Sequence, residues 1–235
     1  MVAADRADPW RRGRTGCGVT ANDPQGWLTE FQVEVAQLFF GLPASDGFLL
    51  AGGAALLAQG LTARPTQDLD FFTQPDAGDV GLAGDQFIAA AGERGWAVDR
   101  VQDSSTFCRL LVHGPEDLLV DLALDSAPGR PASASIAGPT FAPDELAGRK
   151  VIALFDRAAA RDFVDVYALV RRFTKTEVLD LAREVDSGFD VRVFLDMLRH
   201  LTRYSDGDLA LGDVDIPALR AFFRHWITEL DPAER

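Results

Sequence analysis

The 235-residue chain is 47% hydrophobic and 25% charged, a composition typical of globular proteins and unlike that of disordered ones. Its formal net charge of −13, from 36 acidic and 23 basic residues, argues against indiscriminate nucleic-acid binding, which depends on neutralising phosphates, but leaves room for a local basic patch. No apolar run approaches the roughly 20 residues that span a bilayer. The N-terminus also lacks the apolar core of a secretion signal, so we expect a cytoplasmic protein without a membrane partner.

The first part of the chain predicts an α/β domain. Residues 1–25 mix Arg, Asp, Gly and Pro without periodicity, so we expect a flexible leader there. Beyond it, apolar residues recur at helical or strand spacing in turn. The pattern predicts a helix over 27–42, a strand at 48–50, a glycine turn at 52–53 with a helix after it, a strand at 69–73, a helix over 83–94 and strands over 96–102, 106–114 and 117–125.

The second part predicts helices only. Residues 126–139 are rich in Gly, Pro, Ser and Ala and should form a linker, or a loop with one edge strand. The fold class is therefore α/β (α+β): a mixed β-sheet flanked by helices over 26–140, followed by a C-terminal helical domain over 141–235. Helices are expected over 143–157, 160–172, 174–186, 190–204 and 215–230.

Two acidic residues interrupt the apolar stretch DLDFF. Side chains two positions apart on a strand share one face, so Asp68 and Asp70 should project together while Leu69 points into the core. Adjacent carboxylates repel each other unless a cation lies between them, and Mg²⁺ or Mn²⁺ suits their oxygens. In a later strand Asp121 breaks another apolar run. If the two strands are neighbours, the three carboxylates converge, enough to hold two metal ions for an in-line attack on phosphorus.

A glycine pair lies upstream of these carboxylates. Gly52 and Gly53 follow a short apolar strand and precede a short helix. Glycines at such a turn let the backbone approach phosphate oxygens closely, and the N–H groups at the start of the helix, near Ala54, face the same way. Alone, either motif is weak, because chance produces both a GG pair and a DxD triplet. Their combination, with a later strand aspartate, favours a phosphate site.

Positive charge is concentrated in residues 147–175, which hold seven basic and three acidic residues in an acidic chain. At 100° per residue, Lys150, Arg157 and Arg161 share one side of a helix, opposite an apolar side. Such a stripe is either an ordinary solvated surface or an anion-binding surface. Lysine occurs at only two positions of the sequence, which makes Lys150 the first candidate for an anion contact.

Together these motifs resemble a known superfamily. GG, 14 residues and DxD, with a later strand aspartate, is similar to the nucleotidyltransferase core, in which the spacing is usually shorter. More narrowly, LAGGAALLAQGLTARPTQDLDFF and GRKVIALFDRAAARDFVDVYAL resemble motifs of the AbiEii/AbiGii family, the MenT-like nucleotidyltransferase toxins of bacterial toxin–antitoxin pairs. The resemblance covers 48–73 and 119–170. Ala54 stands where many relatives carry Ser or Thr, so only backbone N–H groups serve there.

The resemblance implies a reaction and further site residues. Asp68, Asp70, Asp121 and Lys150 would be catalytic, with Lys150, Arg157 and Arg161 contacting the triphosphate. The resemblance also marks Asp162 and Asp165, which would pair with arginines, orient Lys150, or act on the acceptor hydroxyl. Arg64 would contact phosphate or acceptor, although an exposed loop arginine is the simpler interpretation.

We therefore expect a nucleotidyltransferase that uses Mg²⁺ or Mn²⁺ to move a nucleoside monophosphate from an NTP to a hydroxyl, releasing pyrophosphate. By resemblance the acceptor is RNA, with the 3′ end of tRNA as the specific expectation, and a cognate antitoxin is a partner. Two alternatives stay open. A metal-dependent glycosyltransferase also uses DxD, on nucleotide sugars, but needs no glycine pair. A catalytically silent nucleotide-binding regulatory module would bind NTP without transfer.

Overall fold

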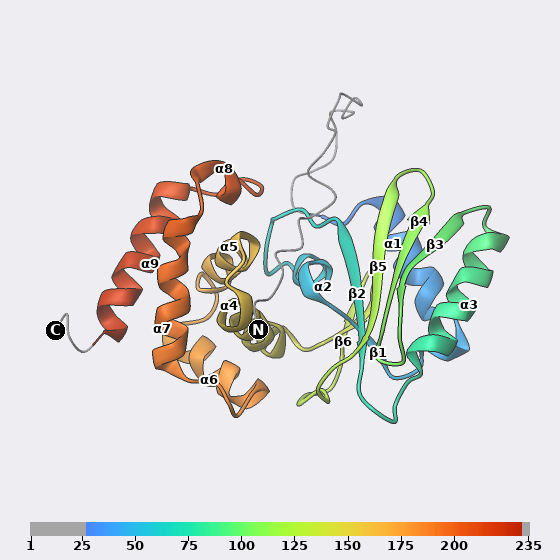
Figure 1. Cartoon of the computed structure of the whole chain (residues 1–235), viewed down its shortest axis with the longest axis horizontal. Helices are drawn as coiled ribbons and strands as arrows, with labels where there is room; N and C mark the ends of the chain where they lie inside the picture. The colour runs from blue at the N-terminus through green and yellow to red at the C-terminus, as the bar shows by residue number, and fades with distance from the viewer. Residues whose placement is uncertain (1–26, 232–235) are drawn as a thin grey trace, which may run out of the picture.

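The computed structural model describes residues 27–231, and the leader expected over 1–25 lies outside them. Within this range the first part of the chain forms a seven-stranded mixed sheet in the order β3-β4-β5-β2-β1-β7-β6, with helices around it (Figure 1). This is the fold class that the sequence predicts. The strands are β1 (Phe48–Ala51), β2 (Asp68–Thr73), β3 (Ala97–Asp103), β4 (Phe107–His113), β5 (Asp117–Leu124), β6 (Ser133–Ser135) and β7 (Gly138–Thr140).

Strand register sets the centre of the sheet. β2 is antiparallel to β1 and parallel to β5, which is in turn antiparallel to β4. Residues that pair across these four strands form one row: Ala51, Asp70, Asp121 and Arg109. Register-paired residues project from the same face of a sheet. The two strands with candidate carboxylates are therefore neighbours, as the sequence argument required.

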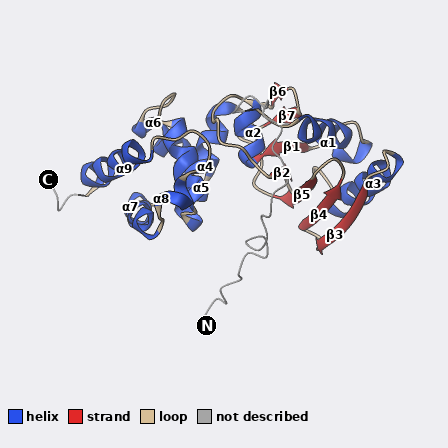
Figure 2. Cartoon of the chain, turned by 90° about the horizontal axis from the view of Figure 1, so that it is seen from above, coloured by secondary structure: helices blue, strands red, loops and turns tan. Residues whose placement is uncertain are grey.

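Helices that pack on one side of the sheet determine which face each β2 side chain takes. α1 (Glu30–Phe40) and α3 (Val80–Glu93) lie on one side of the sheet, whereas α2 (Gly52–Ala58) and the helical half lie on the other (Figure 2). Phe39 of α1 stacks on Phe71 of β2 with ring centroids 4.2 Å apart. Leu69 and Phe71 are fully buried on this side. Because side chains alternate along a strand, this packing turns Asp68 and Asp70 to the opposite face.

The second part of the chain is helical and has its own apolar cluster, centred on Trp226, Phe223 and Phe163. Leu146 and Ala147 belong instead to the cluster of the sheet, so the two parts are packed together. The boundary expected at 140 falls between β7 and the first of these helices, and the division into domains stays a prediction. The elements are α4 (Pro143–Arg157), α5 (Ala160–Leu169), α6 (Lys175–Val185), α7 (Val191–Arg199), η3 (His200–Arg203), α8 (Asp206–Leu209) and α9 (Ile216–Leu230), with a further short 3₁₀ turn, η2 (Pro43–Ser45), in the first part.

Three local expectations need correction. Lys150, Arg157 and Arg161 do not lie on one helix, as the comparison of their angles assumed, because Ala158 adopts a left-handed backbone (φ 45°, ψ 47°) that ends α4 before α5 begins, at the break predicted between 143–157 and 160–172. The 126–139 segment forms a two-stranded β6–β7 unit that adds to the sheet beside β1, rather than one edge strand. The glycine pair is the first turn of α2, not a separate turn before it.

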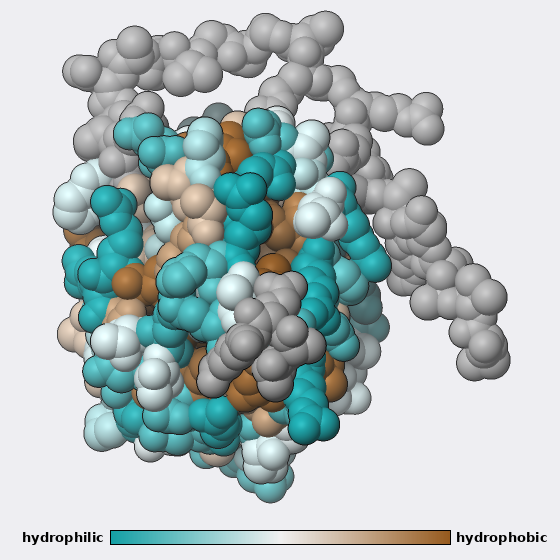
Figure 3. Space-filling view, turned by 90° about the vertical axis from the view of Figure 1, so that its left-hand side faces the viewer, coloured by the Kyte–Doolittle hydropathy of each residue, from teal (hydrophilic) through white to brown (hydrophobic). Residues whose placement is uncertain are grey.

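Hydrophilic residues cover most of the outer face of the helical half, and hydrophobic ones show in narrow strips between them (Figure 3). None of the helices described over residues 27–231 has the length and apolar character needed to span a bilayer.

Gly148 provides a test of the packing between α4 and α6. A Cβ at this position would lie 2.6 Å from the Leu181 carbonyl oxygen, so the helices must separate to accept it. We expect Gly148→Ala to lower the free energy of unfolding by about 1–3 kcal/mol. Gly92→Ala on α3 is the control, because a Cβ there meets nothing within 4 Å, and it should raise stability by roughly 0.5–1 kcal/mol. Equal effects in urea unfolding would contradict this packing.

Candidate active site

A cleft of about 530 Å³ lies between the sheet and the helical half. Both halves contribute to its wall, which is why no contiguous stretch of sequence encodes it. Of the predicted site residues, those in the lining are Gly52, Gly53, Arg64, Asp68, Asp70, Lys150, Arg157 and Arg161. Four others do not line the cleft and are buried next to it: Ala54, Asp121, Asp162 and Asp165.

Gly52 is required by the position of Asp70. Its φ of +60° is strained for residues with a side chain, and a Cβ there would lie 1.8 Å from Asp70 Oδ2. Gly53 is similarly enclosed, since a Cβ would lie 2.8 Å from Thr66 Oγ1 and 2.9 Å from Arg64 Nη2. The two glycines therefore let the start of α2 lie directly against the carboxylate strand. Ala54 is fully buried and can offer only its backbone.

Asp70 is crowded by negative charge. Burial, with the charges of Asp68 and Asp121, raises the pKa of Asp70 to about 7, although Lys150 and Arg161 act in the opposite direction. Among the described residues no hydrogen-bond donor or ion-pair partner contacts the Asp70 carboxylate. Asp68, beside it, accepts a 2.6 Å hydrogen bond from Thr66 and a 3.4 Å contact from Arg161. The pair thus presents carboxylate oxygens that a hard divalent cation would satisfy.

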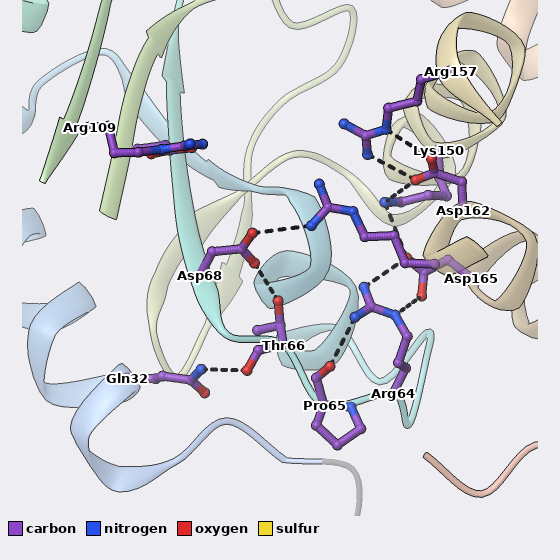
Figure 4. A network of polar contacts seen from close by, with 12 residues as sticks. Gln32, Arg64, Pro65, Thr66, Asp68, Arg109, Lys150, Arg157, Asp162 and Asp165 are labelled. Atoms are coloured by element: carbon purple, nitrogen blue, oxygen red, sulfur yellow. Dashed lines mark hydrogen bonds and ion pairs between the residues drawn. The ribbon is translucent and has the colours of Figure 1, made fainter. Parts of the chain in front are cut away.

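Lys150 is held opposite these carboxylates by two fully buried acids. Its Nζ lies 3.2 Å from Asp165 Oδ2 and 3.5 Å from Asp162 Oδ1. Arg64 binds Asp165 through two nitrogens at 2.8 and 3.0 Å, which joins the sheet half to α5. Figure 4 shows this network, with Lys150 and its acids facing Arg64 and Asp68. Arg64 is therefore a buried connecting residue and not the exposed loop arginine that sequence alone favoured.

Both carboxylate oxygens of Asp162 also accept hydrogen bonds. Arg157 donates to both of its oxygens at 2.9 Å, and the Ala159 backbone N–H donates to Oδ2 at 3.2 Å. Burial alone would raise the pKa of Asp162, but the Arg157 hydrogen bonds and the Lys150 charge lower it overall. Arg157 and Arg161 keep about half of their side-chain surface exposed. They therefore leave positive charge available on the cleft wall.

Asp121 has a partner that sequence reasoning missed. Arg109 of β4 donates to both of its carboxylate oxygens, at 2.8 and 2.6 Å. No group of three or more His, Cys, Asp or Glu side chains within residues 27–231 is arranged to hold a metal ion. The third-ligand role expected of Asp121 stays a prediction. Arg109 could have been found by aligning the β4–β5 hairpin, because its register places the two residues opposite each other.

Arg149 also escaped the sequence analysis. It lies against the Phe141 ring, 3.9 Å from its centroid, and forms ion pairs with Asp125 and Glu145 at 2.9 and 2.8 Å. Asp125 and Arg149 both line the cleft. The end of β5 is thereby attached to α4, which fixes the distance between the two cleft walls.

Comparisons with known proteins bear on the family and the fold of this chain. The family model described as nucleotidyl transferase AbiEii toxin, Type IV TA system, matches residues 38–203. A putative nucleotidyltransferase from Helicobacter pylori is similar in structure, with a TM-score of 0.56, 17% identity, and coverage of 88% of this chain and 97% of that one. JHP933 from Helicobacter pylori gives a TM-score of 0.55 with 18% identity, covering 88% and 94%.

The nucleotidyltransferase toxin MenT4 from Mycobacterium tuberculosis H37Rv gives a TM-score of 0.54 with 17% identity, covering 88% of this chain and 92% of that one. No curated protein matches the sequence. At these identities the solved structures support the fold alone, whereas the family model spans most of the chain.

The crowding of Asp70 makes a prediction about stability. Its pKa in the folded protein, about 7, is above the ordinary value of 3.8, so the group favours folding only at low pH and loses that contribution as pH rises through about 7. Asp70→Asn removes the charge. Without divalent ions, we expect the variant to melt roughly 4 °C or more above the unmodified protein at about pH 8, and the gap to close towards about pH 4. A gap that is the same at both pH values would contradict the proposed crowding.

Proposed function

The chain belongs to the nucleotidyl transferase AbiEii toxin family and is a nucleotidyltransferase, and on this premise we propose that it transfers a nucleoside monophosphate from an NTP to a hydroxyl of RNA. The bond that forms joins the hydroxyl oxygen to the α-phosphorus, and pyrophosphate leaves. The observation that carries the proposal is the pair Asp68 and Asp70, which faces Lys150 across one cleft and in which no described side chain forms a hydrogen bond or ion pair with Asp70.

Asp68 and Asp70 would hold the divalent ion, Mg²⁺ or Mn²⁺, since both line the cleft and offer oxygen ligands. The ion supplies charge neutralisation at the phosphates and polarises the reacting one. This chain's own groups do the remaining work of positioning, which dominates phosphoryl transfer. Gly52 and Gly53 admit the phosphates close to the backbone because they have no side chain to exclude them.

Lys150 would bind the triphosphate. It lines the cleft, and its contacts with Asp162 and Asp165 hold the ammonium group in one position before the nucleotide binds. Arg157 and Arg161 would add contacts through their exposed nitrogens. The three roles left open for Asp162 and Asp165 are no longer equally supported. Both carboxylates are fully buried and already bonded to cationic side chains. We therefore propose that they orient Lys150 and the arginines and do not take the proton of the acceptor hydroxyl.

The acceptor and the partner are proposed from the family resemblance. We propose RNA, with the tRNA 3′ end as the first substrate to try, because the family comprises toxins and because Arg157 and Arg161 give the cleft wall a local positive charge in an otherwise acidic chain. A cognate antitoxin would counteract the activity. A glycosyltransferase is disfavoured, since the family model matches and the glycines are built around Asp70.

The catalytically silent module remains the second candidate for two reasons. Arg109 engages both oxygens of Asp121, and Ala54 has no hydroxyl. Such a protein would bind an NTP with Mg²⁺ but would never label an acceptor. Binding and transfer must therefore be measured separately.

The test is incubation with each radiolabelled NTP in turn, Mg²⁺ and total RNA. We expect label to enter RNA with at least one nucleotide. Asp70→Asn, which removes a proposed metal ligand, and Lys150→Met, which removes a cation at the phosphates, should each reduce the rate by about 100-fold or more.

Lys175→Met is the matched control, because the chain has only one other lysine and Lys175 pairs with Glu229 in the helical half, outside the cleft. It should keep near-full activity. Full activity of Lys150→Met, or equal loss in both lysine variants, would overturn the assignment of Lys150. NTP binding without label in any RNA would select the silent module.

A further inference from the structure

Arg109 binds the carboxylate of Asp121, the residue that the sequence predicts as a third metal ligand. The cross-strand row runs from Asp70 through Asp121 to Arg109, so the Arg109 backbone lies one strand beyond Asp121 and its side chain reaches back to the Asp121 carboxylate. Its Nε and Nη2 contact the two Asp121 oxygens at 2.8 and 2.6 Å. This fork geometry is the strongest arrangement for an arginine and a carboxylate.

The arginine is also held from its other side. The Arg109 guanidinium lies 5.5 Å from the centroid of the Phe107 ring, two residues earlier on the same face of β4. Asp121 is only 6% exposed and does not line the cleft. Each Asp121 oxygen therefore already accepts a charged hydrogen bond, and an incoming ion would have to share that oxygen with the guanidinium or displace it, whereas Asp68 and Asp70 face the cleft directly.

The net charge of the carboxylate cluster also favours a single divalent ion. Ionised Asp68, Asp70 and Asp121 together carry three negative charges, and the permanently charged Arg109 neutralises one of them. Two negative charges remain, which one divalent ion balances. The 3.4 Å contact of Arg161 with Asp68 is longer, and Arg161 is half exposed, so Arg161 is available to nucleotide phosphates and is not committed to the carboxylates.

We propose that Arg109 is a positioning residue that takes the place of a second divalent cation, holding Asp121 so that the carboxylate cluster of the nucleotide-free protein binds one divalent ion, at Asp68 and Asp70. The inference rests on the proposed function, because it presumes that these two aspartates bind metal. It replaces the expectation of two ions shared among three carboxylates.

The experiment counts Mn²⁺ ions bound to the nucleotide-free protein, by calorimetric titration and by the electron paramagnetic resonance of free Mn²⁺. The unmodified protein should bind one ion. Asp121→Asn should still bind one, with an affinity within about 3-fold, because an ion-paired Asp121 is not a ligand. Arg109→Met should gain a second ion, because it frees Asp121, whereas Arg109→Lys keeps the charge and should bind one.

Arg100→Met is the matched control. Arg100 lies on β3 of the same sheet and forms ion pairs with two exposed acids, Asp85 and Asp103, so its loss should leave the count at one.

The outcomes distinguish failure of the role of Arg109 from failure of the metal site at Asp68 and Asp70. A fall of tenfold or more in Mn²⁺ affinity for Asp121→Asn, two ions in the unmodified protein, or a count of one for folded Arg109→Met would each overturn the role of Arg109 while leaving the metal site in place. If Arg109→Met does not fold, the Asp121→Asn affinity decides alone. If the unmodified protein binds no Mn²⁺, the metal site of the proposed function fails and the role of Arg109 falls with it.

Discussion

Three carboxylates forced onto one face of a sheet are the constraint on which the site depends. Asp70 and Asp121 are register partners on parallel strands, and Asp68 is two residues from Asp70, so backbone pairing prevents them from separating. Their mutual repulsion can be relieved only by cations or protons. The surrounding structure supplies positive charge from three directions: Arg109 of β4 in direct contact with Asp121, Arg161 of α5 at 3.4 Å from Asp68, and Lys150 of α4 acting on Asp70 through its charge without a direct contact.

Those cations are themselves fixed by a second layer of acids. Asp165 binds Lys150 and Arg64 together, and Asp162 binds Lys150 and Arg157. Such buried ion pairs often contribute little net stability, because desolvation offsets their attraction. Their value here is geometric, since Arg64 belongs to the sheet half and Asp165 to the helical half. The same network that aims Lys150 also sets the width of the cleft.

Much of this was accessible from the sequence, for local physical reasons. The alternation around Leu69 and Phe71 gave the faces of β2, and the apolar run around Asp121 identified a second carboxylate strand. What the alternation within single strands does not show is how the strands pair. Arg109 looks like an ordinary polar residue of an alternating strand until the hairpin register sets it opposite Asp121. The helical pattern predicted the break between α4 and α5, but the left-handed Ala158 that makes this break carries no glycine or asparagine signal.

The solvent exposure of charged residues was also hard to predict from the sequence. Arg64, in a loop rich in small and polar residues, is 9% exposed because Asp165 draws its guanidinium inward. Asp162 and Asp165 were ambiguous in sequence because helical spacing shows which residues are neighbours but not whether solvent reaches them. Only the packing of α5 against α4 and the sheet half distinguishes a buried orienting acid from one exposed to substrate.

We propose that the carboxylates of β2 and the lysine of α4 bind one nucleotide from opposite walls of the cleft. The most direct measurement is a crystal structure with Mn²⁺ and an NTP analogue whose α–β bridge cannot be cleaved, using anomalous scattering to locate manganese. The account predicts manganese in contact with both Asp68 and Asp70 and a triphosphate oxygen within hydrogen-bonding distance of Lys150 Nζ. Manganese away from these aspartates, or a triphosphate that does not reach Lys150, would contradict it.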